Sequence, residues 1–123
     1  IEGISFGILD GVNSILKVNN NFEKIFMVGG GSKSKFWIEL LASLLNKNLS
    51  VCDQSEFGAA LGVARLAMYV DKNISTKENI IKEIKISKTY NPRQEKIDLL
   101  LKRYNIWKDL YSSNKKIASN LLT

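Results

Sequence analysis

Three consecutive glycines are the part of this sequence whose residue types and spacing best suit ligand binding. The apolar run Phe26-Met27-Val28 leads into Gly29-Gly30-Gly31, and Ser32 and Lys33 follow. Apolar residues then recur at the spacing of one helical face, at Trp37, Leu40, Leu41, Leu44 and Leu45. We therefore expect the glycines in a turn between a strand and a helix. A ligand can approach a backbone without β-carbons, and the first N–H groups of a helix attract a phosphate or another anion.

Two familiar phosphate-binding motifs were tested against this turn. A P-loop requires Gly-Lys-Ser/Thr, but Ser32 separates Gly31 from Lys33. A dinucleotide-binding fingerprint requires a third glycine where Ser34 stands, although Asp53 falls where a ribose-binding acid is expected. The pattern excludes the first motif and weakens the second. A chain reversal that binds no ligand stays open as an alternative.

The composition excludes several kinds of active site. The sequence has no histidine and a single cysteine, Cys52, so an internal disulfide, a His/Cys zinc site and a histidine-dependent triad are excluded. We expect Cys52 to be a small buried hydrophobe. Asp53 and Glu56 lie near the motifs, but acids in such places more often cap or solvate a turn. No catalytic residue and no metal ligand is therefore assigned.

Size and charge bound the possible partners. The chain has 123 residues, of which 45% are hydrophobic, and this suits one small domain. Residues 1–71 contain six Lys or Arg and seven Asp or Glu, whereas residues 72–123 contain twelve Lys or Arg and five Asp or Glu. Because these lysines alternate with acids and no RNA-binding motif accompanies them, we expect a solvated face and no nucleic-acid partner. No apolar run is long enough to cross a bilayer and no signal peptide is recognisable, so we expect a cytoplasmic protein without a membrane partner.

The elements that must position the glycine turn form a short α/β pattern. We expect helices over residues 1–18, 34–45 and 57–70, and strands over 24–28 and 49–52. The two strands flank the second helix in a right-handed βαβ unit, so they should be parallel neighbours or near neighbours. Four apolar residues share one face of the first helix: Ile4, Ile8, Val12 and Ile15. The third helix has small residues that suit close packing on the sheet, namely Ala60, Gly62, Ala64 and Ala67, although proximity to a ligand is an equal alternative for Gly62. Trp37 of the second helix is expected to be largely buried against the sheet.

The last third of the chain is expected to close one side of the domain. We expect a short helix over residues 76–81, an edge strand or extended arm over 84–87, and a long helix whose first residue is Pro92. Its apolar stripe, Ile97, Leu100, Tyr104, Trp107 and Tyr111, is expected to lie against helices 1–18 and 57–70. Two strands leave sheet edges unpaired, so a homo-oligomer is a further expectation.

Three ordered motifs resemble the carboxy-terminal domain of the FGGY carbohydrate kinases, most closely the xylulokinase branch. They are Glu2-Gly3-Ile4 near the start of a helix, the glycine turn with Ser34 and Trp37, and the run 58–62 that opens a later helix. Tyr90-Asn91-Pro92 is similar to the family's lead into its last helix, so the resemblance covers nearly the whole chain. It implies an α/β fold that is part of an actin-like ATPase (ribonuclease H-like) domain.

The resemblance also implies where a nucleotide binds. Gly29, Gly30, Gly31 and Ser32 would hold the nucleotide at its α-phosphate and ribose, while Gly58 and Leu61 would lie near the base. Ser32 replaces the family's usual alanine, and Lys35 stands where some members carry an asparagine near the adenine.

The activity implied is transfer of the ATP γ-phosphoryl group, with Mg²⁺ present, to a ketose such as xylulose, which gives the sugar 5-phosphate. The sugar-binding amino-terminal domain, the family's aspartate base and the hairpin that opens the second domain have no counterpart in residues 1–123. We therefore expect a fragment that is inactive alone. Two alternatives stay open, namely a stand-alone non-catalytic nucleotide-binding or oligomerisation module, and a dinucleotide-binding unit that uses Asp53.

Overall fold

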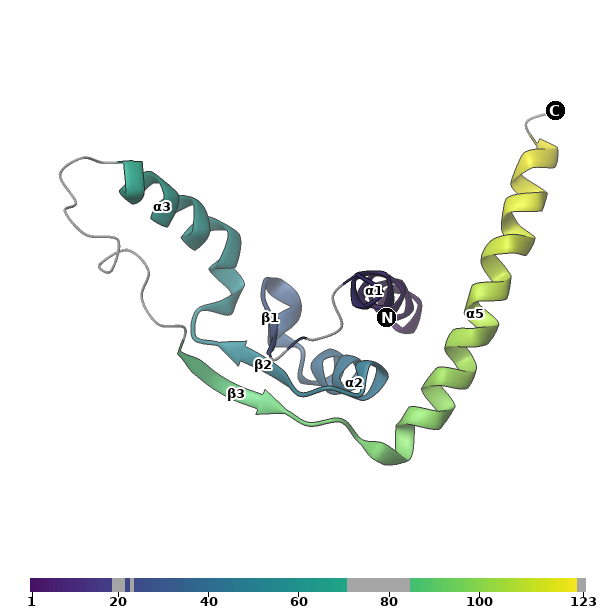
Figure 1. Ribbon diagram of the computed structural model, residues 1–123, viewed down its shortest axis with the longest axis horizontal. Helices are drawn as coiled ribbons and strands as arrows, with labels where there is room; N and C mark the ends of the chain where they lie inside the picture. Colours follow the sequence, from purple (N-terminus) through teal and green to yellow (C-terminus); the bar gives the residue numbers. More distant parts are fainter. Residues whose placement is uncertain (19–21, 23, 71–84, 122–123) are drawn as a thin grey trace.

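The computed structural model describes residues 1–18, 22, 24–70 and 85–121, and the elements of these segments surround a three-stranded sheet (Figure 1). In chain order the α-helices and strands are α1 (Glu2–Leu16), β1 (Ile25–Met27), α2 (Lys35–Leu45), β2 (Leu49–Cys52), α3 (Gly58–Val70), β3 (Ile86–Tyr90) and α5 (Gln94–Leu121). Short 3₁₀ helices, η1 (Gly30–Lys33) and η2 (Ser55–Phe57), precede α2 and α3. The predicted short helix over residues 76–81 lies outside the described residues.

The sheet has the strand order β1-β2-β3. β1 and β2 are parallel, with Ile25 opposite Leu49 and Met27 opposite Val51, so the predicted pairing of the βαβ strands is confirmed. β3 runs antiparallel to β2 and places Thr89 opposite Ser50. It begins two residues later than the expected edge strand, and it makes the sheet one strand wider than the two-stranded sheet that we expected.

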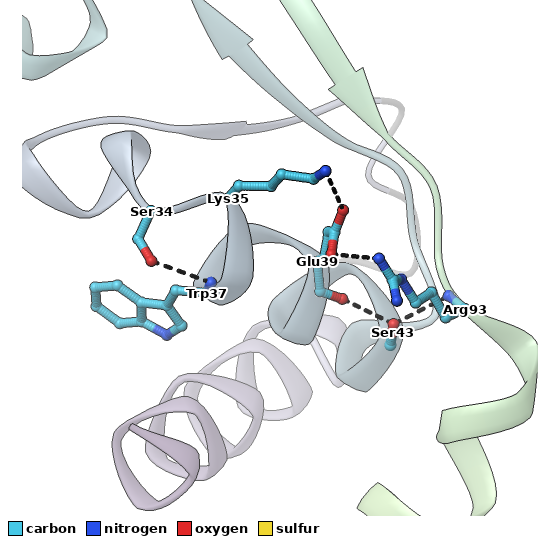
Figure 2. A network of polar contacts seen from close by, with 6 residues as sticks. All are labelled: Ser34, Lys35, Trp37, Glu39, Ser43 and Arg93. Carbon is cyan, nitrogen blue, oxygen red and sulfur yellow. Dashed lines mark hydrogen bonds and ion pairs between the residues drawn. The ribbon is translucent and has the colours of Figure 1, made fainter.

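Helix α2 is the centre of the packing. Ser34 caps its first turn, because the Ser34 hydroxyl accepts a hydrogen bond of 3.3 Å from the Trp37 N–H (Figure 2). Asn46 ends the helix in the left-handed conformation that favours asparagine and glycine. On the sheet side of α2 the buried residues are Ile38, Leu41, Ala42, Leu49 and Val51. On the opposite side, α1 and α5 contribute to a second cluster of Phe6, Leu9, Leu40, Leu44, Leu100 and Tyr104.

Polar contacts attach the start of α5 to α2. The Arg93 guanidinium donates to the Glu39 carboxylate at 2.6 Å, and the Arg93 backbone N–H donates to the Ser43 hydroxyl at 3.0 Å. The Ser43 hydroxyl in turn donates to the Glu39 carbonyl, and the Lys35 ammonium lies 3.8 Å from the same carboxylate (Figure 2). These contacts hold the residue that precedes α5 against α2.

Several details differ from the expected packing. α5 begins at Gln94, two residues after Pro92, and it packs on α1 and α2. It does not pack on α3, which lies at the opposite end of the molecule (Figure 1). The far end of its stripe is uncovered, with Tyr111 70% exposed. Two isoleucines of α1 also face outward, since Ile4 is 62% exposed and Ile8 is 37% exposed. Phe6 and Leu9 form the buried face of this helix instead.

Helix α3 departs furthest from expectation. It buries no residue, and a β-carbon added to Gly62 would meet nothing within 4 Å. The expected packing of its small residues on the sheet is therefore wrong for the described residues.

No helix within the described segments is both long and apolar enough to cross a membrane.

Candidate functional site

A cavity of about 560 Å³ lies where β1 and β2 end, beside the first turns of α3. Its wall is formed by Val28, Cys52, Asp53, Gln54, Ser55, Gly58, Leu61, Gly62, Arg65 and Lys85. Val28 follows β1 directly and Cys52 is the last residue of β2. The cavity therefore opens at the carboxyl ends of two parallel strands, which is where α/β sheets usually bind ligands.

The glycine turn is joined to the wall of this cavity. The Gly29 N–H donates to the Ser55 carbonyl at 2.7 Å, and the hydroxyls of Ser32 and Ser55 lie 2.7 Å apart. Gly58 and Leu61, two of the predicted site residues, line the cavity, whereas Gly29 to Ser32 lie next to it. The structure therefore brings the glycine motif and the 58–62 motif together across Ser55.

Lys35, the remaining predicted site residue, is not part of the cavity wall. Its side chain is 69% exposed and its ammonium pairs with Glu39 on the next turn of α2. Figure 2 shows it directed toward Glu39 and Arg93, which attach α5. Its predicted contact with the adenine therefore stays a prediction.

The three glycines of the turn have different surroundings. Gly29 has φ +84°, a conformation that residues other than glycine rarely adopt. A β-carbon on Gly30 would meet nothing within 4 Å, whereas one on Gly31 would lie 2.6 Å from Cζ3 of Trp37. Gly30 is thus open toward solvent, and Gly31 accommodates the indole ring beneath the turn.

Trp37 supports the turn from the protein side. Its ring packs against residues of both core clusters, and its indole N–H donates to the Ser5 hydroxyl at 2.9 Å. The predicted packing against the sheet is confirmed, although the side chain is only half-buried. Because the indole nitrogen reaches α1, one residue connects the glycine turn, the sheet and the first helix.

The cavity wall carries both charged and apolar groups. Arg65 and Lys85 contribute two cations, and neither forms an ion pair with any residue that the structure describes. Cys52 is half-buried rather than fully buried as expected. Burial, with a smaller contribution from the adjacent Asp53 carboxylate, raises the pKa of the Cys52 thiol. With Val28 and Leu61 also in the wall, the cavity suits a ligand that has both an apolar surface and negative charge.

The described residues contain no group of three or more His, Cys, Asp or Glu side chains that could hold a metal ion. We therefore assign no Mg²⁺ ligand to them.

Several residues of the cavity wall were not predicted from the sequence. Ser55 follows β2 by three residues and Arg65 follows Leu61 by one helical turn, so strand ends and helical spacing would have indicated both. Lys85 is different. Its place depends on how β3 pairs with β2, and the Asp53 N–H donates to the Lys85 carbonyl at 3.0 Å just before that strand. A pairing between distant segments of this kind has no local signal.

Comparison with protein families gives a match over residues 1–70 to the FGGY family of carbohydrate kinases, C-terminal domain. A xylulose kinase of Staphylococcus epidermidis is 30% identical over 124 residues, and the alignment covers 100% of this chain and 25% of that enzyme. The xylulose kinase of Escherichia coli K12 is 22% identical over 111 residues, which cover 90% of this chain and 23% of the enzyme. The chain therefore spans about a quarter of the length of these relatives.

Comparison with solved structures identifies the fold. A crystal structure described as a xyloylose kinase from Brucella ovis superimposes with a TM-score of 0.76 at 26% identity, over 94% of this chain and 24% of that one. The structure of ligand-bound xylulose kinase from Lactobacillus acidophilus gives a TM-score of 0.66 at 24% identity, over 91% of this chain and 23% of that one. These likenesses confirm the predicted fold class, an α/β part of the actin-like fold of sugar kinases.

Proposed function

Because this chain belongs to the FGGY family of carbohydrate kinases, with its match in the carboxy-terminal domain, we propose that it forms the ATP-binding part of a sugar kinase. In the whole kinase, ATP supplies the γ-phosphoryl group that is transferred to a ketose such as xylulose, giving the sugar 5-phosphate. The similarity to xylulose kinases supports this choice of sugar. Phosphoryl transfer depends mainly on positioning and charge stabilisation, so the task of this chain is to hold the nucleotide.

The observation that carries the proposal is the attachment of the glycine turn to the cavity wall at Ser55. We place the α-phosphate and ribose along the backbone of Gly30, Gly31 and Ser32, since Gly30 leaves the outer side of the turn open. The base then lies in the cavity beside Gly58 and Leu61. Gly29 supplies the positive φ that starts the turn.

The charged residues of the wall complement such a ligand. Arg65 and Lys85 offer cations to the phosphate and ribose side of the nucleotide. Lys35 remains a predicted contact near the adenine, and to reach it the ammonium must leave Glu39. Mg²⁺ would accompany ATP in the whole kinase, with ligands outside this set of residues. We further propose a cytoplasmic location, ATP or ADP and a sugar as partners, and no nucleic-acid or membrane partner.

Protection of Cys52 from alkylation tests nucleotide binding directly. Cys52 lines the cavity and is the single cysteine, so mass spectrometry reads its modification without ambiguity. We expect ADP to slow alkylation, measured near pH 9 because the raised thiol pKa makes the reaction slow at neutral pH. Absence of protection by any nucleotide would overturn the proposal, and stronger protection by NAD than by ADP would favour the dinucleotide-binding alternative with Asp53 on a ribose.

A pair of arginine variants provides the matched control. Arg65→Ala removes a cation from the cavity wall, and we expect it to weaken ADP protection about tenfold, the loss of one charge-assisted hydrogen bond. Arg103→Ala removes an arginine of α5 that pairs with Glu2 at 2.6 Å, away from the cavity. Equal effects of the two variants would mean that the protection does not report on this cavity.

The alternative of a stand-alone module is tested by the gene. An upstream reading frame, continuous with this chain, that encodes a sugar-binding kinase domain supports the kinase. An unrelated upstream sequence would favour a non-catalytic nucleotide-binding or oligomerisation module.

A further inference from the structure

We propose that the hydroxyl pair of Ser32 and Ser55 positions the glycine turn against the cavity and so sets the affinity for the nucleotide; this rests on the function proposed above. Both residues are buried, at 8% and 6% exposure, and their Oγ atoms lie 2.7 Å apart across 23 residues of sequence. Ser32 belongs to the glycine turn, whereas Ser55 belongs to the wall of the cavity. We call this pair the serine clasp.

The direction of the hydrogen bonds in the clasp follows from counting protons. The Ser32 hydroxyl donates its one proton to the Gly29 carbonyl, at 2.7 Å. Ser32 Oγ must therefore accept from Ser55 Oγ, which is the donor of the pair. Two backbone bonds lie beside this chain of hydroxyls, one from the Ser32 N–H to the Gly29 carbonyl at 3.0 Å and one from the Gly29 N–H to the Ser55 carbonyl at 2.7 Å. Every polar atom of the clasp is thus engaged within the protein.

The clasp adds side-chain restraints to a part of the turn whose glycines allow wide rotation. Gly29 and Gly30 have no side chains that restrict rotation, and a β-carbon on Gly30 would meet nothing within 4 Å. The Ser32 hydroxyl and the Ser32 N–H both donate to the Gly29 carbonyl, which restrains the peptide that joins Gly29 to Gly30. Since the other end of the clasp is Ser55, the turn and the cavity are kept at one separation, as a ligand that binds to both requires.

Ser32 distinguishes this chain from the family motif that the glycine turn resembles. That motif usually has alanine at the position of Ser32, and an alanine cannot form the clasp. Ser32→Ala therefore removes the hydroxyl pair with a residue that the fold accommodates. Trp37 and the Gly29–Ser55 backbone bond still hold the turn to the protein in this variant, so it changes the orientation of the turn without detaching it.

A double-mutant cycle tests the clasp in the full chain. The dissociation constant for ADP is measured for wild type, Ser32→Ala, Ser55→Ala and the double variant. We expect each single variant to bind ADP about 3- to 10-fold more weakly, as for the loss of one or two hydrogen bonds, and the double variant to be no weaker than Ser32→Ala. Melting temperatures are recorded alongside. Either single variant suffices if the other fails to fold, because both remove the Ser32–Ser55 bond, although Ser32→Ala also removes the bond to the Gly29 carbonyl.

Ser50→Ala is the matched control. Ser50 and Thr89 form another hydroxyl pair, 3.0 Å apart, between β2 and β3 and outside the cavity wall. We expect this variant to bind ADP like wild type. In the whole kinase, Ser32→Ala should raise KM for ATP by a larger factor than KM for the sugar, whereas loss of folded enzyme would lower the apparent kcat and leave both KM values as they are.

The outcomes separate this inference from the proposed function. If wild type fails to bind ADP, the proposed function is wrong. If wild type binds ADP and Ser32→Ala binds it equally well, or Ser50→Ala weakens it as much, the clasp has no positioning role while the function stands. Multiplicative effects in the double variant would likewise show that the two serines act separately.

Discussion

At the scale of single residues, Gly30 and Gly31 are adjacent and chemically identical, yet they face opposite environments. We expect Gly31→Ala to destabilise the protein by about 1–3 kcal/mol, because its β-carbon would lie 2.6 Å from the Trp37 ring. Gly30→Ala should leave the melting temperature unchanged or slightly higher, since its β-carbon meets nothing, and weaken ADP binding at least tenfold. Thermal melting and ADP titration of the two variants measure this contrast.

Each variant is the control for the other. Unchanged ADP affinity in a folded Gly30→Ala protein would mean that the glycine turn only reverses the chain. An unchanged melting temperature in Gly31→Ala would mean that the Trp37 ring moves aside at little cost. Substituting Gly31 alone would not test ligand binding, because lost affinity there also follows from displacement of the indole.

At the scale of secondary-structure elements, Tyr104 joins α5 to α1 through a hydrogen bond that titrates. Its hydroxyl donates to the Asp10 carboxylate at 2.8 Å, and burial together with this hydrogen bond raises the pKa of Tyr104. The folded state thus favours the neutral phenol, so this contribution to stability is fully present below the pKa of an unfolded tyrosine, about 10, and is lost as pH rises through the higher folded value.

Tyr104→Phe tests that linkage. We expect it to cost about 1 kcal/mol at pH 7.5, through the lost hydrogen bond, and to make unfolding less sensitive to pH above about pH 10, where an unfolded tyrosine ionises. Urea unfolding at several pH values measures both effects. Tyr111→Phe is the control, because Tyr111 is 70% exposed on the same helix. An alkaline loss of stability as steep in Tyr104→Phe as in wild type would exclude Tyr104 as its source.

The same scale shows how far local sequence patterns predict this structure. The βαβ unit was predicted closely, with β2 at the expected residues and α2 one residue shorter, because its apolar spacing and its glycines agree. The glycine turn and the 58–62 motif were predicted to contribute to one site, and they meet at Ser55. The packing partners of α3, the buried face of α1 and the place of Lys85 were not predicted. These features depend on contacts between distant segments. In helices with many apolar residues, helical periodicity does not identify which face is buried or which element covers it.

At the scale of the whole molecule, uncovered apolar surface is the main feature beyond the core. Val63, Leu66 and Tyr69 on α3 are 53–68% exposed, and Ile4 on α1 is 62% exposed. Patches of this kind favour association. We expect the isolated chain to form concentration-dependent oligomers, measured by sedimentation velocity, and Val63→Lys with Leu66→Lys to shift it toward monomer. The exposed pair Leu99→Lys and Ile106→Lys on α5 is the control. Purely monomeric behaviour at high concentration would contradict the expected homo-oligomer.

For the whole molecule, nucleotide binding and catalysis are expected to be separable. The glycine turn and the cavity supply groups that hold a nucleotide, but none of the described residues was assigned as a base for a sugar hydroxyl, and the chain spans about a quarter of its xylulose kinase relatives. We therefore expect the isolated chain to bind ADP and to give no xylulose-dependent release of ADP from ATP in a coupled assay. The whole kinase should catalyse this release, and Gly30→Ala within it should raise KM for ATP far more than KM for xylulose, because the altered residue lies at the nucleotide alone. Xylulose-dependent turnover by the isolated chain would refute this division of labour. An equal rise of both KM values in the folded whole kinase would show that the glycine turn acts on more than the nucleotide.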